Sequence, residues 1–89
     1  MIALRYHENF LVSAKQLPKD YQDKLARLLS LLQENPFHPL LHTKRLSGKL
    51  AGFLSFRITR DWRVIFQFSD PKTVQLLRVR NRKNAYRWI

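Results

Sequence analysis

The chain has no cysteine and few acidic residues, and both shortages limit what it can be. Without cysteine it forms neither a disulfide nor a thiolate metal site, which fits a reducing compartment. No apolar run approaches the roughly 20 residues that a membrane-spanning helix needs. The first ten residues, MIALRYHENF, lack the basic and apolar regions of a signal peptide. We therefore expect a cytoplasmic protein, and its 89 residues predict a single domain over 1–89.

The acidic residues are scarcest in the second part of the chain. Residues 1–34 hold five Lys/Arg and four Asp/Glu, a net charge of +1. Residues 35–89 hold twelve Lys/Arg and two acids, Asp61 and Asp70, a net charge of +10. Such an asymmetry within one small domain predicts a polyanionic partner: nucleic acid, an acidic protein or an anionic membrane surface. A surface that serves only solubility usually mixes both signs.

The first 35 residues predict a strand and a helical hairpin. Apolar residues alternate from Ile2 to Tyr6, as in a short strand. A helix follows from about Glu8 and ends at Pro18, a residue that suits the first turn of a second helix. That second helix carries a one-sided apolar stripe until Asn35-Pro36 stops it. The stripe, which we assign to the core, is Tyr21, Leu25, Leu28, Leu29 and Leu32.

Residues 36–52 hold both glycines and two of the four prolines, and they predict a loop that turns at Gly48 and Gly52. Three strands follow: FLSFRI, DWRVIFQF and TVQLLRVR. In the last of these, alternation places Leu77 and Val79 on one face and Leu76, Arg78 and Arg80 on the other. We expect an α+β fold of order β-α-α-β-β-β, with the helical hairpin packed on one face of a small, largely antiparallel sheet.

Two arginines of the expected sheet face away from its apolar side. Arg57 lies opposite Leu54, Phe56 and Ile58, and Arg63 lies opposite the aromatic side of the next strand. Like charges that face each other on a sheet are destabilising without a ligand, so the pair favours a bound anion. A planar guanidinium binds phosphate oxygens bidentately. The alternative is that each arginine pairs with Asp61 or the C-terminal carboxylate, or lies in solvent.

The C-terminal tail interleaves basic residues with aromatics, around Tyr86. This pattern suits single-stranded nucleic acid, which needs charges for phosphates and rings for bases. We expect further RNA contacts from basic residues along the loop and strands: Lys44, Arg45, Lys49, Arg60, Arg78, Arg80 and Lys83. The histidines lack the carboxylate or cysteine neighbours of a metal site, although His42 is a candidate acid or base. We expect no metal and no cofactor.

The chain resembles the RelE/ParE superfamily of bacterial type II toxins over nearly its whole length. The resemblance rests on ENPFHP, LHTKRLSGKLAGFLSFRI, WRVIFQF and VQLLRV, followed by a late tyrosine. It implies a RelE-like fold. RelE-like and YafQ-like members cut mRNA on the ribosome without a metal, whereas ParE-like members poison DNA gyrase.

The resemblance also implies roles for particular residues. Arg57 matches a basic residue of the second strand, and Arg63 matches the arginine that holds the scissile phosphate. Arg82 matches an arginine or histidine that acts toward the leaving group, and Tyr86 matches a late aromatic that orients the substrate. Ser55, where some RelE proteins have a lysine, departs from the pattern, as does the Asn81-Arg82 turn. Arg57, Arg63, Arg82 and Tyr86 are therefore the predicted catalytic residues.

The departures leave the general base open. Arginine has a pKa above 12 and does not readily accept a proton. Tyr86 is our preferred base, because surrounding arginines lower the pKa of a phenol; His42 and Asp61 are the other candidates. The base would assist the attack of a ribose 2′-hydroxyl on the adjacent phosphate, with arginines stabilising the developing charge.

Three functions follow. The first is a ribosome-dependent, metal-independent mRNA endoribonuclease that inhibits translation, with mRNA and the ribosome as partners. The second is a ParE-like DNA gyrase inhibitor, and the third is an inactive or RNA-binding RelE homologue. In each case the resemblance implies a cognate antitoxin, which we expect to be small, acidic and partly disordered, and no membrane partner.

Overall fold

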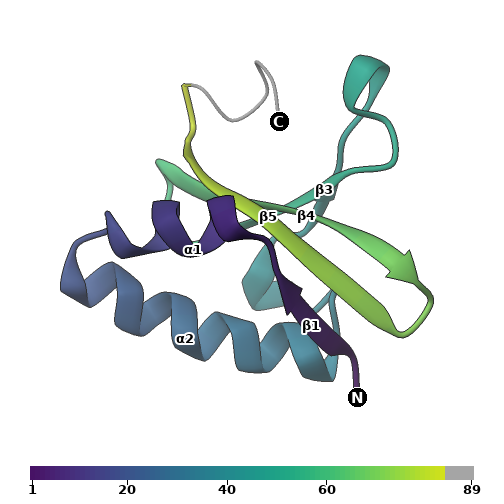
Figure 1. The fold of residues 1–89 in the computed structure, drawn as a ribbon, viewed down its shortest axis with the longest axis horizontal. Helices are drawn as coiled ribbons and strands as arrows, with labels where there is room; N and C mark the ends of the chain where they lie inside the picture. The colour runs from purple at the N-terminus through teal and green to yellow at the C-terminus, as the bar shows by residue number, and fades with distance from the viewer. Residues whose placement is uncertain (84–89) are drawn as a thin grey trace.

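The computed structural model describes residues 1–83, and residues 84–89 lie outside that description. Within residues 1–83, one five-stranded sheet and two α-helices make up the fold (Figure 1). The elements in chain order are β1 (Ala3–Tyr6), α1 (Glu8–Lys15), α2 (Lys19–Glu34), the 3-10 turn η1 (Pro39–Leu41), β2 (Lys44–Arg45), the 3-10 turn η2 (Gly48–Leu50), β3 (Leu54–Arg57), β4 (Trp62–Asp70) and β5 (Thr73–Asn81).

The strands follow the order β1-β5-β4-β3-β2 across the sheet. The pairs β2–β3, β3–β4 and β4–β5 are antiparallel, and β1 joins β5 in parallel through the helical hairpin. The expected α+β class and largely antiparallel sheet are confirmed. The prediction lacked β2, because two residues are too short to show an alternating pattern.

Both helices cover the same face of the sheet (Figure 1). The leucine stripe of α2 supplies Leu25, Leu28 and Leu32 to the core, as its spacing predicts. The sheet contributes apolar residues from β3, β4 and β5, including Phe56 and Phe66, whose ring centroids lie 5.9 Å apart. One face of the sheet is therefore buried against the helices.

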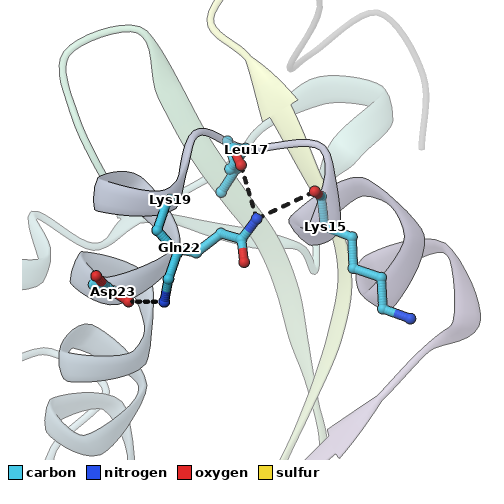
Figure 2. A network of polar contacts seen from close by, with 5 residues as sticks. All are labelled: Lys15, Leu17, Lys19, Gln22 and Asp23. Atoms are coloured by element: carbon cyan, nitrogen blue, oxygen red, sulfur yellow. Dashed lines mark hydrogen bonds and ion pairs between the residues drawn. The ribbon is translucent and has the colours of Figure 1, made fainter.

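The turn between the helices is held by polar contacts (Figure 2). The side-chain amide of Gln22 donates to the carbonyl of Leu17 at 2.8 Å and to that of Lys15 at 3.2 Å. These bonds satisfy two carbonyls at the end of α1 that no helical N–H can reach. Lys19 and Asp23 form an exposed ion pair at 2.9 Å one turn further on. The Gln22 bonds join the end of α1 to the first turns of α2.

A β-bulge corrects the face pattern predicted for β5. Phe66 pairs with Leu76, but its neighbour Ile65 pairs with Arg78, so Leu77 is an extra residue in β5. Leu76 and Val79 are consequently both in the core, where simple alternation had placed them on opposite faces. The physical reason is that an inserted residue reverses the side-chain alternation beyond it.

The loop between β2 and β3 depends on glycine. Gly48 has φ +64° and Gly52 has φ +95°, conformations that other residues adopt with strain. The predicted turns at these positions are confirmed. The loop around η2 projects beyond the end of β3 (Figure 1).

Candidate functional site

The face of the sheet opposite α1 and α2, called the open face below, presents arginines in a row. The strand register pairs Arg57 of β3 with Arg63 of β4, and Arg63 with Arg80 of β5. The predicted opposition of Arg57 and Arg63 is confirmed, and the bulge in β5 adds Arg80. Directly opposed residues in antiparallel strands have Cβ atoms only about 4.5–5.5 Å apart. These three residues, called the arginine row, concentrate three positive charges across three neighbouring strands.

The arginines of the row are half-buried rather than extended into solvent. The Nε atoms of Arg57 and Arg63 are inaccessible, and neither makes a hydrogen bond. Neither side chain forms an ion pair with a residue in the described range 1–83. The alternative that Asp61 neutralises them therefore finds no support in the described part of the chain. A desolvated guanidinium without an acceptor is costly, so the row is suited to an anionic ligand.

The electrostatic environment of Arg80 agrees with this geometry. Its pKa is lowered from the ordinary arginine value, first by burial and second by the positive charge of Arg78. Both effects penalise the protonated form. An anion bound at the row would oppose both, because it would favour the charged guanidinium.

A second row lies two residues along the strands. Lys44, Ser55, Ile65 and Arg78 pair successively across β2, β3, β4 and β5. The middle of this row is neutral and buried: Ser55 and Ile65 are 0% and 1% exposed, and Ser55 Oγ has no hydrogen-bond partner. Two residues of strand span about 6.8 Å. The second row thus has cations at its two ends, Lys44 on β2 and Arg78 on β5, and a neutral middle.

The two acids of residues 35–89 lie away from the middle of the open face. Asp61 precedes β4 and Asp70 ends it. Asp61 lies beside the end of β5, because its carbonyl accepts a hydrogen bond from the Arg82 N–H. Asp61, Asn81, Arg82 and Lys83 line one hollow. The structure therefore places Arg82 and the candidate base Asp61 together, two residues beyond the Arg63–Arg80 pair along β4 and β5.

The remaining predicted cations are distributed around the sheet. Lys49 lies in η2 and Arg60 in the β3–β4 turn, and both are exposed. Arg45 pairs with the core-facing Leu54, and its guanidinium lies 5.1 Å from the ring centroid of Phe37. Arg45 therefore faces the helix side rather than the arginine row. This separation follows from the alternation of β2, whose other residue is Lys44.

The other candidate acids and bases are outside the row. His42 is exposed and follows η1 with a left-handed backbone, φ 49°. Tyr86 lies outside the described residues. No group of three or more histidine, aspartate or glutamate side chains that could hold a metal ion occurs within 1–83. No helix in that range is long and apolar enough to cross a membrane.

The sequence pattern did not identify Arg80 as a member of the row. Simple alternation placed Arg80 on the same face as Leu76, and the bulge at Leu77 reverses that relation. Where a hairpin contains bulges, the local sequence does not predict which residues of its two strands pair far from the turn. The two arginines of β5, Arg78 and Arg80, were the sequence feature that could have indicated a third cation beside Arg57 and Arg63.

Comparisons with known proteins agree with the fold. Residues 4–86 match the family described as "ParE toxin of type II toxin-antitoxin system, parDE". The fold is similar to YafQ from E. coli strain BL21(DE3), with TM-score 0.77, 21% identity and coverage of 97% of this chain and 99% of that one. It is equally similar to the archaeal RelE in the RelE–RelB complex from Pyrococcus horikoshii OT3, with TM-score 0.77, 20% identity and coverage of 94% and 98%.

A third similar structure is the YoeB/ParE toxin from Agrobacterium tumefaciens, with TM-score 0.77, 20% identity and coverage of 90% of this chain and 98% of that one. No curated protein sequence matches the chain significantly. Identities this low establish the fold and leave the activity to the chemistry of the site. The family match covers most of the chain: it belongs to the ParE toxin family of type II toxin–antitoxin systems, within the ParE/RelE superfamily.

Proposed function

We propose that this toxin is a ribosome-dependent endoribonuclease that cuts mRNA and thereby inhibits translation. The observation that carries the proposal is the arginine row, in which Arg57 and Arg63 are half-buried, opposed and without an acid partner in the described range. A surface built only for solubility would leave its guanidiniums hydrated. A phosphodiester supplies two anionic oxygens to such a row, and arginine is the side chain best shaped to bind them.

The row would stabilise charge during strand cleavage. The 2′-hydroxyl oxygen attacks the adjacent phosphorus, the bond from phosphorus to the 5′-oxygen breaks, and the products are a 2′,3′-cyclic phosphate and a 5′-hydroxyl. One proton leaves the 2′-hydroxyl for a base, and one is delivered to the departing 5′-oxygen. Guanidiniums that are already desolvated and fixed by strand pairing need little reorganisation as negative charge builds on the phosphoryl oxygens.

The proton transfers must come from outside the row, because arginine is a poor base at neutral pH. Arg82 is proposed to act toward the leaving group, and its position in the hollow beside Asp61 is compatible with that role. Tyr86 remains our preferred base, with Asp61 and His42 as the other candidates. Ser55 adds a hydroxyl to the second row but no strong base.

Mapping mRNA 5′ ends after incubation with translating ribosomes tests the proposal. Wild type should produce new ends within the codon that occupies the ribosomal decoding site. Arg63→Ala should reduce their rate by roughly 100-fold or more, since loss of one preorganised charge contact typically has that effect. The matched control is Arg27→Ala, which removes an exposed arginine from α2. Equal cleavage by wild type and Arg63→Ala, or none by either, would exclude this mechanism.

A second candidate is inhibition of DNA gyrase, which the match to the ParE toxin family favours. In that case the arginine row would bind a protein or DNA surface without cleaving RNA. A supercoiling assay separates the two functions, because an mRNA nuclease leaves gyrase activity unchanged. A third candidate, an inactive or RNA-binding homologue, predicts normal growth on expression.

We further propose that an antitoxin binds this chain. Similar structures include the RelE–RelB complex cited above and a YoeB–YefM complex from Staphylococcus aureus. With a net charge of +11, the present chain would favour a small, acidic and partly disordered partner. Such a partner would compete with RNA if it covers the open face, and its affinity should fall with added salt.

A further inference from the structure

A further row of side chains lies on the open face beyond the two rows described above. Gln67 of β4 pairs with Gln75 of β5, and Gln75 pairs in turn with Arg5 of β1. These three residues are called the amide row below. It is the next open-face step along the strands after the second row. None of the catalytic roles proposed above uses it.

Strand alternation puts the amide row on the same face of the sheet as the arginine row. Gln67 is four residues from Arg63 in β4, and the alternate residues of that strand pack in or against the core: Val64, Phe66 and Phe68. In β5, Gln75 lies between two core residues, Val74 and Leu76, so it also faces the open side. Four residues of strand span about 13–14 Å, which is the separation of the two rows along β4.

The amide row offers hydrogen-bonding groups that the described chain does not use. The side chains of Gln67 and Gln75 are half-buried, and neither makes a hydrogen bond to a residue in the range 1–83. Directly opposed residues in antiparallel strands have Cβ atoms about 4.5–5.5 Å apart, so the two amides lie side by side. Each amide presents a donor and an acceptor, the combination that binds the edge of a nucleobase bidentately.

The neighbours of these amides supply the other contacts that an RNA strand needs. Phe53 comes directly before β3, and the register of β3 with β4, continued by one step, brings it beside Gln67. Phe53 is half-buried and lies outside the core cluster. Arg5 is exposed and forms no ion pair within residues 1–83. Aromatic rings stack on bases, and cations bind phosphates.

We propose that the amide row reads a base of the same RNA strand whose phosphate is held by the arginine row, and that Gln67 and Gln75 set a base preference. The inference rests on the proposed RNA-binding function and deepens it. A stacked strand advances about 3.4 Å per nucleotide and an extended one advances more, so at most about four nucleotides separate the two contacts. A base within a duplex is already paired, so the substrate is single-stranded.

Binding of the full-length toxin to single-stranded hexanucleotides tests the site. The probes are 2′-O-methylated oligo(A), oligo(C) and oligo(U), which lack the attacking 2′-hydroxyl, and an abasic strand of the same length. The three strands with bases should differ in Kd by roughly fivefold or more, because bidentate amide contacts discriminate between base edges. In ¹⁵N-labelled toxin they should shift the side-chain amide signals of Gln67 and Gln75, whereas the abasic strand should not.

Gln67→Met/Gln75→Met keeps the approximate size of both side chains and removes both amides. It should reduce the differences among the three strands to within about twofold, since the discriminating contacts are gone. The abasic strand should bind this variant as it binds wild type, because its phosphates contact the arginine row. The matched control is Gln33→Met, an amide change on α2, which should preserve the base preference. Arg63→Ala should weaken all four probes alike.

Several results would overturn the base contact. They are equal affinity of wild type for the three strands with bases, a base preference that survives in the double variant, loss of abasic-strand binding in that variant, or no binding of any probe. The nuclease proposal fails separately. If binding depends on the base and on both amides, and ribosomes nevertheless yield no cleaved mRNA, the base contact stands and the nuclease proposal is refuted.

Discussion

The opposed charges of the arginine row predict that a substitution at its centre stabilises the protein. Arg63 lies between Arg57 and Arg80, and directly opposed like charges each cost roughly 0.2–1 kcal/mol. Arg63→Gln keeps most of the aliphatic stem and removes the middle charge. We expect it to raise the free energy of unfolding by about 1 kcal/mol at low salt. For a domain of this size that corresponds to a rise in Tm of about 4–8 °C.

Salt and phosphate provide the internal controls for this prediction. The gain in Tm should shrink in 1 M salt, where the Debye length falls to about 3 Å. An anion present at ten times its Kd should stabilise wild type by about 1.4 kcal/mol and Arg63→Gln by less. Arg27→Gln, at an exposed position of α2, should change Tm little under any of these conditions. Two results would refute the interpretation of the row as an anion-binding site: a lower Tm for Arg63→Gln than for wild type at low salt, or a Tm difference that does not change with salt.

Two further predictions concern the frame around the row. Ser13 Oγ accepts a hydrogen bond from the Val79 N–H at 2.9 Å and donates one to the Asn9 carbonyl at 2.7 Å. Ser13→Ala should therefore lower the free energy of unfolding, measured in a urea melt, by about 1–3 kcal/mol. An unchanged urea midpoint would contradict this. Gly52→Ala should lower the free energy of unfolding by about 1–2 kcal/mol through backbone strain at φ +95°. The added Cβ would contact no other atom, so strain is the whole effect. A Tm equal to that of wild type would contradict this.

Much of the fold follows from short-range patterns. The leucine stripe of α2 predicts its buried side, because a helix with apolar residues at three- and four-residue steps must cover them. Alternation in β3 and β4 predicts that Phe56 and Phe66 are buried and that Arg57 and Arg63 face away from them. These positions depend only on the period of the local structure.

The remaining features depend on pairing between distant segments. β2 is set by its register against β3, with Lys44 opposite Ser55, and two residues carry no period of their own. The parallel pairing of β1 with β5 joins residues about 70 positions apart in the chain. The position of Arg80 depends on a bulge at Leu77. Resemblance to the RelE/ParE superfamily identified the family, and it singled out Arg82, whereas the residue that the register places opposite Arg63 is Arg80.

The bulge links the core to the charge of the open face. In a regular strand Leu76, Arg78 and Arg80 would share one side, so either a leucine would be exposed or two arginines would lie under the helices. The extra residue Leu77 lets Leu76 and Val79 enter the core while both arginines face the open side. At this point Val79 donates its N–H to Ser13 of α1. The helix that packs against the core therefore also holds the part of β5 that presents Arg80 to the row, so weakening that bond should reduce anion affinity as well as stability.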